Sequence, residues 1–249
     1  MNTPLNRNND LEAEASPLLY PTMIESPELR WGFIRKVYAI LTVQLLVTIA
    51  VAATVYIFRP ISSLFARTVL GLSLYFTIIV TSLVVLIAML VLGKKQPLNH
   101  FHLGLFTICL SLMVGVSCAF TSGKVIVEAA ILTAVIFLSL SLYTFWAARR
   151  GHDFSFLEPF LFAALTGLLV FGLIEFFYPV DNVTNGVVGI ITFCGYVVYD
   201  TENLIKRYKH DEYISAAIVL YLDILNLFLK LVRWKRRLLA KIEKMLDFL

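Results

Sequence analysis

The stretch LGLSLYFTIIVTSLVVLIAMLVL, at Leu70–Leu92, contains no charged residue. A helix needs about 20 consecutive apolar residues to cross the hydrocarbon core of a bilayer, so this run is long enough. Within hydrocarbon the backbone must satisfy its own hydrogen bonds, which favours a helix. The stretch therefore predicts one transmembrane helix.

Six further apolar runs of similar length lie on either side of this one. They are Val37–Phe58, Leu103–Phe120, Val125–Ala148, Leu157–Tyr178, Thr184–Ile205 and Tyr213–Val232. Short connections that contain helix breakers, such as Arg59-Pro60, separate the runs. The predicted fold class is an all-α membrane protein, with a seven-helix transmembrane bundle over residues 30–232.

The composition also points to a membrane protein. Of the 249 residues, 59% are hydrophobic and 15% are charged, and the mean hydropathy is +0.82. Soluble domains have roughly 25% charged residues. Seven spans leave no room for a separate soluble catalytic domain. The net charge of +4 comes from basic residues in short loops and in the C-terminal tail, a pattern that suits membrane lipids with anionic headgroups better than nucleic acid.

The two ends of the chain differ in character. Residues 1–29 are rich in Asn, Asp, Glu and Pro and have few apolar residues, which predicts a disordered cytosolic N-terminal tail. Residues 233–249 form a basic amphipathic C-terminal tail, with apolar residues three or four apart. That spacing is typical of a helix in the membrane interface, although a soluble cap on the bundle would show it too.

The charged loops predict an orientation, because cytosolic loops carry an excess of Lys and Arg. A cytosolic N-terminus puts eleven such residues on the cytosolic side and three on the other. The eleven are Arg7, Arg30, Arg35, Lys36, Lys94, Lys95, Arg149, Arg150, Lys206, Arg207 and Lys209, and the three are Arg59, Arg67 and Lys124. The basic tail conflicts with this rule if the seventh run crosses fully. Either that run dips in and returns, or it crosses and the bundle overrides the charge bias.

Two aspartates lie deep inside predicted spans. Asp200 is about five residues from the cytosolic end of the sixth run and Asp223 about ten residues into the seventh. Burying an ionisable side chain there costs roughly 2.5 to 3.5 kcal/mol, so each needs a partner, a water-filled cavity or a function. The two runs are joined by a short loop, so the acids are expected to face each other across one helical hairpin. Helical spacing adds Tyr196 and Asn203 beside Asp200, and Asn226 beside Asp223.

Two adjacent carboxylates in a medium of low dielectric constant are expected to share one proton unless a cation joins them. After deprotonation the same oxygens become hard ligands suited to Ca²⁺, which makes Asp200 and Asp223 a hypothetical weak calcium site. The alternative is that each Asp hydrogen-bonds a backbone or hydroxyl group and only fixes helix packing. Three other acids, Glu128, Glu158 and Glu175, lie near span ends, where a structural role is expected.

Motifs for nucleotide or hydrolase chemistry are absent from the sequence, which has no Walker loop, HExxH, GxSxG or Rossmann fingerprint. No cofactor and no enzymatic activity are therefore expected. The three cysteines, Cys109, Cys118 and Cys194, lie within apolar runs and are interpreted as core packing.

Three stretches resemble one protein family. They are ELRWGFIRKVYAILTVQLLVT at Glu28–Thr48, GYVVYDTENLI at Gly195–Ile205 and AAIVLYLDILNLFLKLV at Ala216–Val232. They are similar to the Lifeguard branch of the Bax inhibitor-1 family, and Ser117–Phe154 resembles its plant members. The resemblance extends from about Glu28 to the C-terminus.

This resemblance implies a bundle whose last helix is central and surrounded by the other six. It also implies a pH-sensitive calcium leak across endomembranes of the endoplasmic reticulum or Golgi, with Ca²⁺ as the permeant ion, and suppression of programmed cell death. The family's acidic pair corresponds to Asp200 and Asp223. Bacterial relatives place an Arg in the second helix near the pair, whereas Leu70–Leu92 has none, so their gating latch differs or is missing here.

Two functional hypotheses follow. In the first, the proton-sharing pair of Asp200 and Asp223 gates a cation leak. In the second, the bundle transports nothing and binds cell-death regulators or other membrane proteins through its tails, a reading favoured by the basic segment from Lys230 onward. A seven-helix receptor is a poorer candidate, because it needs its N-terminus outside the cytosol.

Overall fold

The computed structural model describes residues 18–21, 23–92, 98–177 and 183–246, and within these ranges the chain is helical with no strand. In chain order the elements are α1 (Pro27–Ile57), α2 (Arg59–Arg67), α3 (Val69–Leu92), α4 (Leu98–Ala119), α5 (Gly123–Arg149), α6 (Leu157–Phe177), α7 (Val183–Lys206), the short 3-10 helix η1 (His210–Glu212) and α8 (Tyr213–Leu246). All of them except α2 and η1 are long and apolar enough to cross a membrane. The predicted seven-helix class is therefore confirmed.

The connection after the first span differs from the prediction. Arg59-Pro60 was expected to break the helix in a short loop, but the chain continues there as α2. Proline occupies the first turn of α2, where its missing N–H would have no intrahelical partner in any case. The proline therefore ends α1 and begins another helix.

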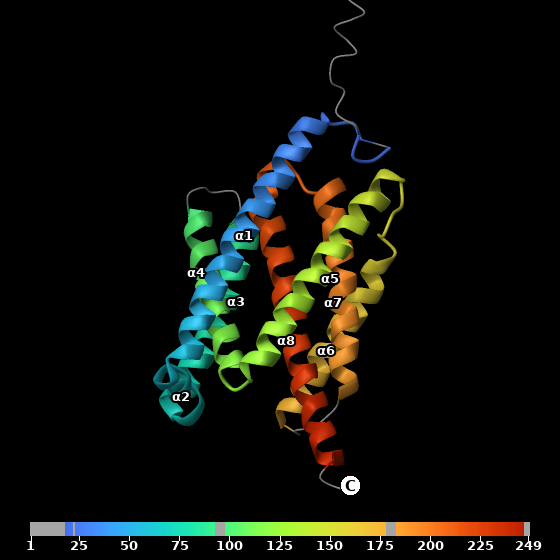
Figure 1. Ribbon diagram of the computed structural model, residues 1–249. Helices are drawn as coiled ribbons and strands as arrows, with labels where there is room; N and C mark the ends of the chain where they lie inside the picture. The colour runs from blue at the N-terminus through green and yellow to red at the C-terminus, as the bar shows by residue number, and fades with distance from the viewer. Residues whose placement is uncertain (1–17, 22, 93–97, 178–182, 247–249) are drawn as a thin grey trace, which may run out of the picture.

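Helix α8 is central to the bundle. It packs against α1, α4, α5 and α7, while α3 packs mainly on α4, and α6 on α7 (Figure 1). It is also the most buried of the seven spans. The central position expected for the last helix is thus observed, but four spans rather than six are its main neighbours, because α3 and α6 lie outside α4 and α7.

The last span crosses the bundle without a break. Its 34 residues extend for roughly 50 Å, well beyond a hydrocarbon core of about 30 Å. The start of α1 and the end of α8 lie at opposite ends of the bundle (Figure 1), so the last run does not dip in and return. Residues 233–246 of the predicted separate tail are the last turns of α8. Most of the predicted N-terminal tail lies outside the described residues, and α1 begins within its last three.

Small residues bring α7 and α8 close together. A Cβ added to Gly186 would lie 2.9 Å from Cβ and 3.4 Å from Cα of Trp234, and one added to Gly189 would meet the aliphatic part of the Lys230 side chain. Glycines at such positions let helix backbones approach within a membrane. The α7–α8 hairpin that carries both aspartates is therefore tightly packed.

Hydroxyl groups join α8 to its neighbours on the other side. The Tyr221 hydroxyl lies 2.7 Å from Oγ1 of Thr48 on α1, and Ser111 Oγ of α4 donates to the same Thr48 oxygen at 3.1 Å. Nearby, Gln44 Nε2 donates to Thr107 Oγ1 at 3.0 Å. These bonds connect α1, α4 and α8 in the bundle interior.

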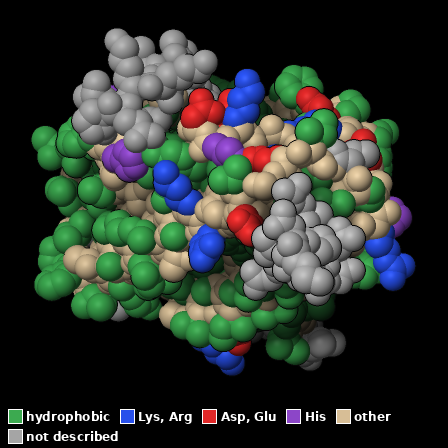
Figure 2. All heavy atoms as spheres, turned by 90° about the horizontal axis from the view of Figure 1, so that it is seen from above, with side chains coloured by type: hydrophobic (Ala, Val, Ile, Leu, Met, Phe, Trp, Pro, Cys, Tyr) green, Lys and Arg blue, Asp and Glu red, His purple; other side chains and the backbone are tan. Residues whose placement is uncertain are grey.

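The outer surface of the helices is mostly apolar. Viewed from the end where α1 begins, hydrophobic side chains surround the rim, and charged and histidine side chains gather over the end itself (Figure 2). Large exposed residues such as Val80, Leu142 and Phe162 lie along the sides. This distribution suits a bundle that stands across a bilayer.

Candidate functional site

The two aspartates lie on the α7–α8 hairpin at the same level of the bundle. Asp200 lies in the last two turns of α7, and Asp223 lies ten residues into α8. Their side chains interact directly, within hydrogen-bonding reach. Asp200 is 7% exposed and Asp223 is 5% exposed. The structure thus brings together the two acids that the sequence places on neighbouring spans.

Polar atoms around this pair have unused hydrogen-bonding capacity. Asn203 Nδ2 donates to Asp200 Oδ1 over a long 3.4 Å. Within the described residues, Asp223 Oδ2 and Asn203 Oδ1 are buried without a hydrogen-bond partner. An unsatisfied buried polar atom costs about 1 to 3 kcal/mol, so a shared proton, a water or a cation at these oxygens would stabilise the site.

The three supporting residues predicted from the sequence behave differently from one another. Asn203 contacts Asp200 as expected. Tyr196 is close enough to both acids to interact electrostatically, and its ring packs against Phe193. The Asn226 side-chain amide donates to the Leu222 carbonyl, four residues earlier in α8, at 2.8 Å. This amide group therefore bonds to the backbone of its own helix instead of binding Asp223.

Tyr208 is a residue near the pair that sequence reasoning missed. It lies between α7 and η1, partly buried, within electrostatic range of Asp200 and Asp223. Burial, together with these carboxylates and Glu212, holds the pKa of Tyr208 well above its usual range, so the phenol stays protonated. The sequence signal was weak, because Tyr208 lies beyond the helix and shares no helical face with Asp200.

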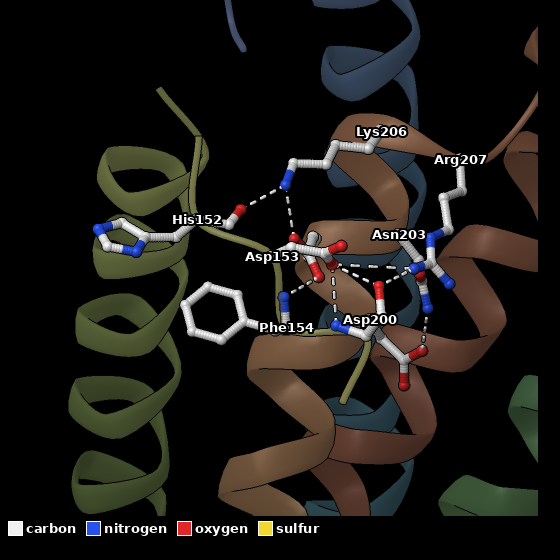
Figure 3. A network of polar contacts seen from close by, with 9 residues as sticks. His152, Asp153, Phe154, Asp200, Asn203, Lys206 and Arg207 are labelled. Carbon is white, nitrogen blue, oxygen red and sulfur yellow. Dashed lines mark hydrogen bonds and ion pairs between the residues drawn. The ribbon is translucent and has the colours of Figure 1, made fainter. Parts of the chain in front are cut away.

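Glu202 is the second residue that was missed, and it is only 1% exposed. Lys206 Nζ donates to its Oε1 at 2.7 Å, and the backbone N–H of Phe154 donates to its Oε2 at 2.9 Å. Lys206 also donates to the carbonyl of His152 (Figure 3). Glu202 and Lys206 therefore clamp the α5–α6 loop onto the end of α7 that carries Asp200. Their i, i+4 spacing was visible in the sequence, but the loop partner was not.

Arg207 extends this clamp. Its Nη2 donates to Ser155 Oγ and lies 4.0 Å from Asp153 Oδ1. Both the hydroxyl and the backbone N–H of Ser155 donate to Asp153. These bonds, the hydroxyl's first, hold the pKa of Asp153 below its usual range. The loop thus owes part of its order to an ionised, exposed carboxylate.

This lowered pKa predicts a pH-dependent effect of Asp153→Asn. A carboxyl whose folded pKa is depressed stabilises the fold above its unfolded pKa of about 3.9, and the stabilisation is lost as the pH falls through the folded pKa. We expect the variant to melt slightly below wild type at about pH 7 and together with it at about pH 2. Thermal unfolding at both pH values checks this, with the exposed Asp211→Asn as control. An equal difference at both pH values would contradict it.

The other end of α8 is held by ion pairs. Lys235 pairs with Glu128 of α5, and Arg237 pairs with Glu175 of α6, with Arg233 at 4.0 Å from the same carboxylate. Glu128 and Glu175 thus have the structural role expected of acids near span ends. They also neutralise part of the basic segment at this end of α8.

The donor set at the pair suits only a weak metal site. Among the described residues, no group of three or more His, Cys, Asp and Glu side chains lies close enough to hold a metal ion. Two carboxylates and an amide are few ligands for Ca²⁺, which takes six to eight oxygens. The weak calcium affinity of this pair remains a prediction.

Comparison with known proteins identifies the family of the chain. A family model described as "Inhibitor of apoptosis-promoting Bax1" matches residues 30–239, which include both aspartates and all seven spans apart from the ends of the first and the last. The chain belongs to the Bax inhibitor-1 family.

Several known proteins are similar to this chain over most of its length, and the first of them supports its place in the Lifeguard branch. Protein LIFEGUARD 3 of Arabidopsis thaliana is 57% identical over 238 residues, which are 93% of this chain and 96% of the relative. Bax inhibitor 1 of Schizosaccharomyces pombe is 37% identical over 82% of this chain and 76% of its own length. The Golgi anti-apoptotic protein of Vaccinia virus is 38% identical over 84% of this chain and 86% of its own.

The resemblance to bacterial members of the family implies an arginine in the second span. Helix α3, the second span, carries no arginine. A buried arginine, Arg30, lies at the start of α1 instead, and its Nη1 donates to the Tyr208 carbonyl at 2.6 Å. This arginine holds the connection above the acids and makes no hydrogen bond to Asp200 or Asp223 within the described residues.

Proposed function

We propose that this Bax inhibitor-1 family member is a pH-sensitive calcium leak in an endomembrane, gated by Asp200 and Asp223. The observation that carries the proposal is the direct contact of two buried carboxyl groups inside a membrane bundle, with a buried oxygen of Asp223 left unbonded. Such a pair stabilises little by itself, because separating either carboxylate from water is costly. A proton or a cation that binds there accounts for the pair better than a purely structural role does.

Competition between proton and cation provides the gating. With one proton shared, the two carboxyl groups bind each other and hold α7 against α8, which closes the path. Loss of that proton leaves two negative charges that repel each other and attract a divalent cation. The few ligands make binding weak, so the ion passes instead of being stored.

The names of the relatives support a role in cell death. Bax inhibitor 1 and the Golgi anti-apoptotic protein are named for restraining it, and the latter also for a membrane compartment. A slow leak lowers the calcium stored in the compartment, so less is released during a death signal. We therefore propose that the chain restrains programmed cell death from the endoplasmic reticulum or Golgi.

Calcium flux from vesicles containing the purified protein tests this proposal across a pH series. We expect wild-type flux to rise with pH and Asp223→Asn to lose both the flux and its pH dependence, because an amide cannot ionise. Asp200→Asn should behave alike, and the exposed Asp211→Asn serves as the matched control. Wild-type flux in Asp223→Asn would refute the gate.

A second function, without transport, is favoured by the exposed end of α8. There, Leu239, Ile242 and Met245 are exposed beside Lys241 and Lys244, a surface suited to a protein partner or a lipid surface. If the chain protects cells by binding, truncation after Leu238 abolishes protection in a cell-death assay and neutralising both aspartates leaves it intact. The leak proposal expects the reverse.

A further inference from the structure

A pocket of about 370 Å³ opens at the end of the bundle where α1 begins, the end seen in Figure 2. Its walls come from the segment before α1, the first turns of α1, the last turn of α7 and the connection to η1. This volume lies within the range of small-molecule sites. Tyr208 also lines the pocket and lies within electrostatic range of the acid pair, so one wall of the pocket is coupled electrostatically to the candidate gate.

Positive side chains dominate the pocket lining. Lys and Arg contribute four of the lining residues, one histidine is added, and a single carboxylate opposes them. These six lining residues are Arg30, Lys206, Arg207, Lys209, His210 and Glu25, and the phenols of Tyr20 and Tyr208 complete the polar lining. The N-terminal end of α1 and the C-terminal end of α7 meet here, and their opposite dipoles largely offset each other. The pocket is therefore electropositive because of its side chains.

Several of these charges already have partners. Lys206 pairs with Glu202, and Arg207 with Ser155 and Asp153. Glu25 pairs with His210 and lies 3.7 Å from Nε of Arg30, whose other N–H donors this carboxylate does not engage. Those contacts hold the walls in place. The ligand must therefore be recognised mainly by the remaining donors, which belong to Arg30 and Lys209.

Arg30 is a buried cation whose donors are mostly unused. Its side chain is 5% exposed, and only Nη1 makes a hydrogen bond within the described residues. Nε is buried without a hydrogen-bond partner there, since the nearest Glu25 oxygen is 3.7 Å away. A guanidinium has five N–H donors in a planar fork that suits a phosphate. Lys209 is exposed at the pocket and adds a mobile ammonium group.

We propose that this pocket binds a phosphate group, carried either by an anionic lipid headgroup or by a soluble phosphate ester. The phosphate accepts hydrogen bonds from Arg30 and Lys209, and Arg207 adds a charge at the rim. Because the pocket joins the segment before α1 to the end of α7, a bound phosphate ties these parts together beside the acid pair. Binding does not depend on whether the bundle conducts calcium.

Binding measurements on the purified full-length protein in detergent test the proposal with two probes. In the first, the melting temperature of the protein is compared between inorganic phosphate and chloride at equal ionic strength. Short-chain phosphatidic acid is compared with phosphatidylcholine of the same chain length, by native mass spectrometry. Binding of the lipid alone assigns a headgroup as the source. If inorganic phosphate binds and displaces the lipid, the pocket accepts a phosphate group from a soluble ester as well as from a lipid. Each of these two results supports the site.

Three variants locate the binding. Arg30→Gln removes a charge-assisted donor and is expected to weaken binding by about tenfold or more. Lys209→Gln, at an exposed position that leaves folding intact, is expected to weaken it by about fivefold. Arg150→Gln removes the same charge from the same end of the bundle outside the pocket, and should bind as wild type does. Equal affinities for Lys209→Gln and Arg150→Gln, or no binding of either probe, would overturn the proposal.

Discussion

Replacing Glu202 with alanine is expected to destabilise the protein by about 3 kcal/mol, because it leaves one end of a buried ion pair without its partner. Glu202 is 1% exposed, and both of its carboxylate oxygens accept a hydrogen bond, from Lys206 and from the backbone of Phe154. The truncation removes both bonds and leaves the ammonium group of Lys206, whose side chain is 18% exposed, facing a cavity. Denaturant unfolding in a fixed detergent measures the loss.

Two further variants separate this ion pair from a general effect of lost charge. Glu243→Ala removes an exposed glutamate near the end of α8 and should change stability by less than about 0.5 kcal/mol. Glu202→Leu combined with Lys206→Met replaces both partners by apolar groups of similar size and should recover part of the loss. If Glu202→Ala unfolds at the same denaturant concentration as Glu243→Ala, the clamp contributes nothing to stability.

Replacing Gly115 with leucine is expected to separate α1 from α4, with a cost of about 3 kcal/mol from overpacking. A Cβ at this position would lie 2.9 Å from Cβ of Val55 and 3.1 Å from Cα of Ala52. The second of these atoms belongs to the backbone, so a rotamer change cannot relieve the contact. The same unfolding measurement detects the effect, and the hydroxyl contacts of α1 and α4 with α8 should loosen with it.

Gly104 of the same helix is the matched control. A Cβ added there meets no atom within 4 Å, so Gly104→Leu has free space. Leucine favours a helix over glycine by up to about 1 kcal/mol, which makes this variant neutral or slightly stabilising. Equal effects of the two substitutions would mean that close packing at Gly115 does not hold α1 against α4.

The positions of the spans were predictable because they depend on local sequence. Leu70–Leu92 predicted α3 to within one residue, since a long uncharged run has few alternatives in a bilayer. The last run was predicted to end at Val232 but continues to Leu246. The spacing of apolar residues predicted a helix in residues 233–249, but not that it would continue the last span, where ion pairs with α5 and α6 hold it.

The acid pair was also predictable from sequence, by depth and connectivity. Asp200 and Asp223 lie in consecutive spans joined by a short loop, so an antiparallel hairpin was expected to let them face each other, although their distances from the span ends differ. The partners of the neighbouring polar side chains were harder to predict from the sequence. Asn203 contacts Asp200, whereas Asn226 donates to the Leu222 carbonyl of its own helix. On a helix, a backbone carbonyl one turn earlier competes with other acceptors for such a side-chain amide.

The amino-acid order alone was enough to establish the membrane bundle, its seven crossings and the two deep acids, because run length and the cost of burying charge are properties of single segments. The positions of Glu202, Arg30 and Tyr208 depended on the folded chain. Arg30 meets the Tyr208 carbonyl across 178 residues, and Glu202 meets Phe154 across 48. Contacts between segments so far apart arise only when the helices have packed, so the clamp and the phosphate pocket became visible only in three dimensions.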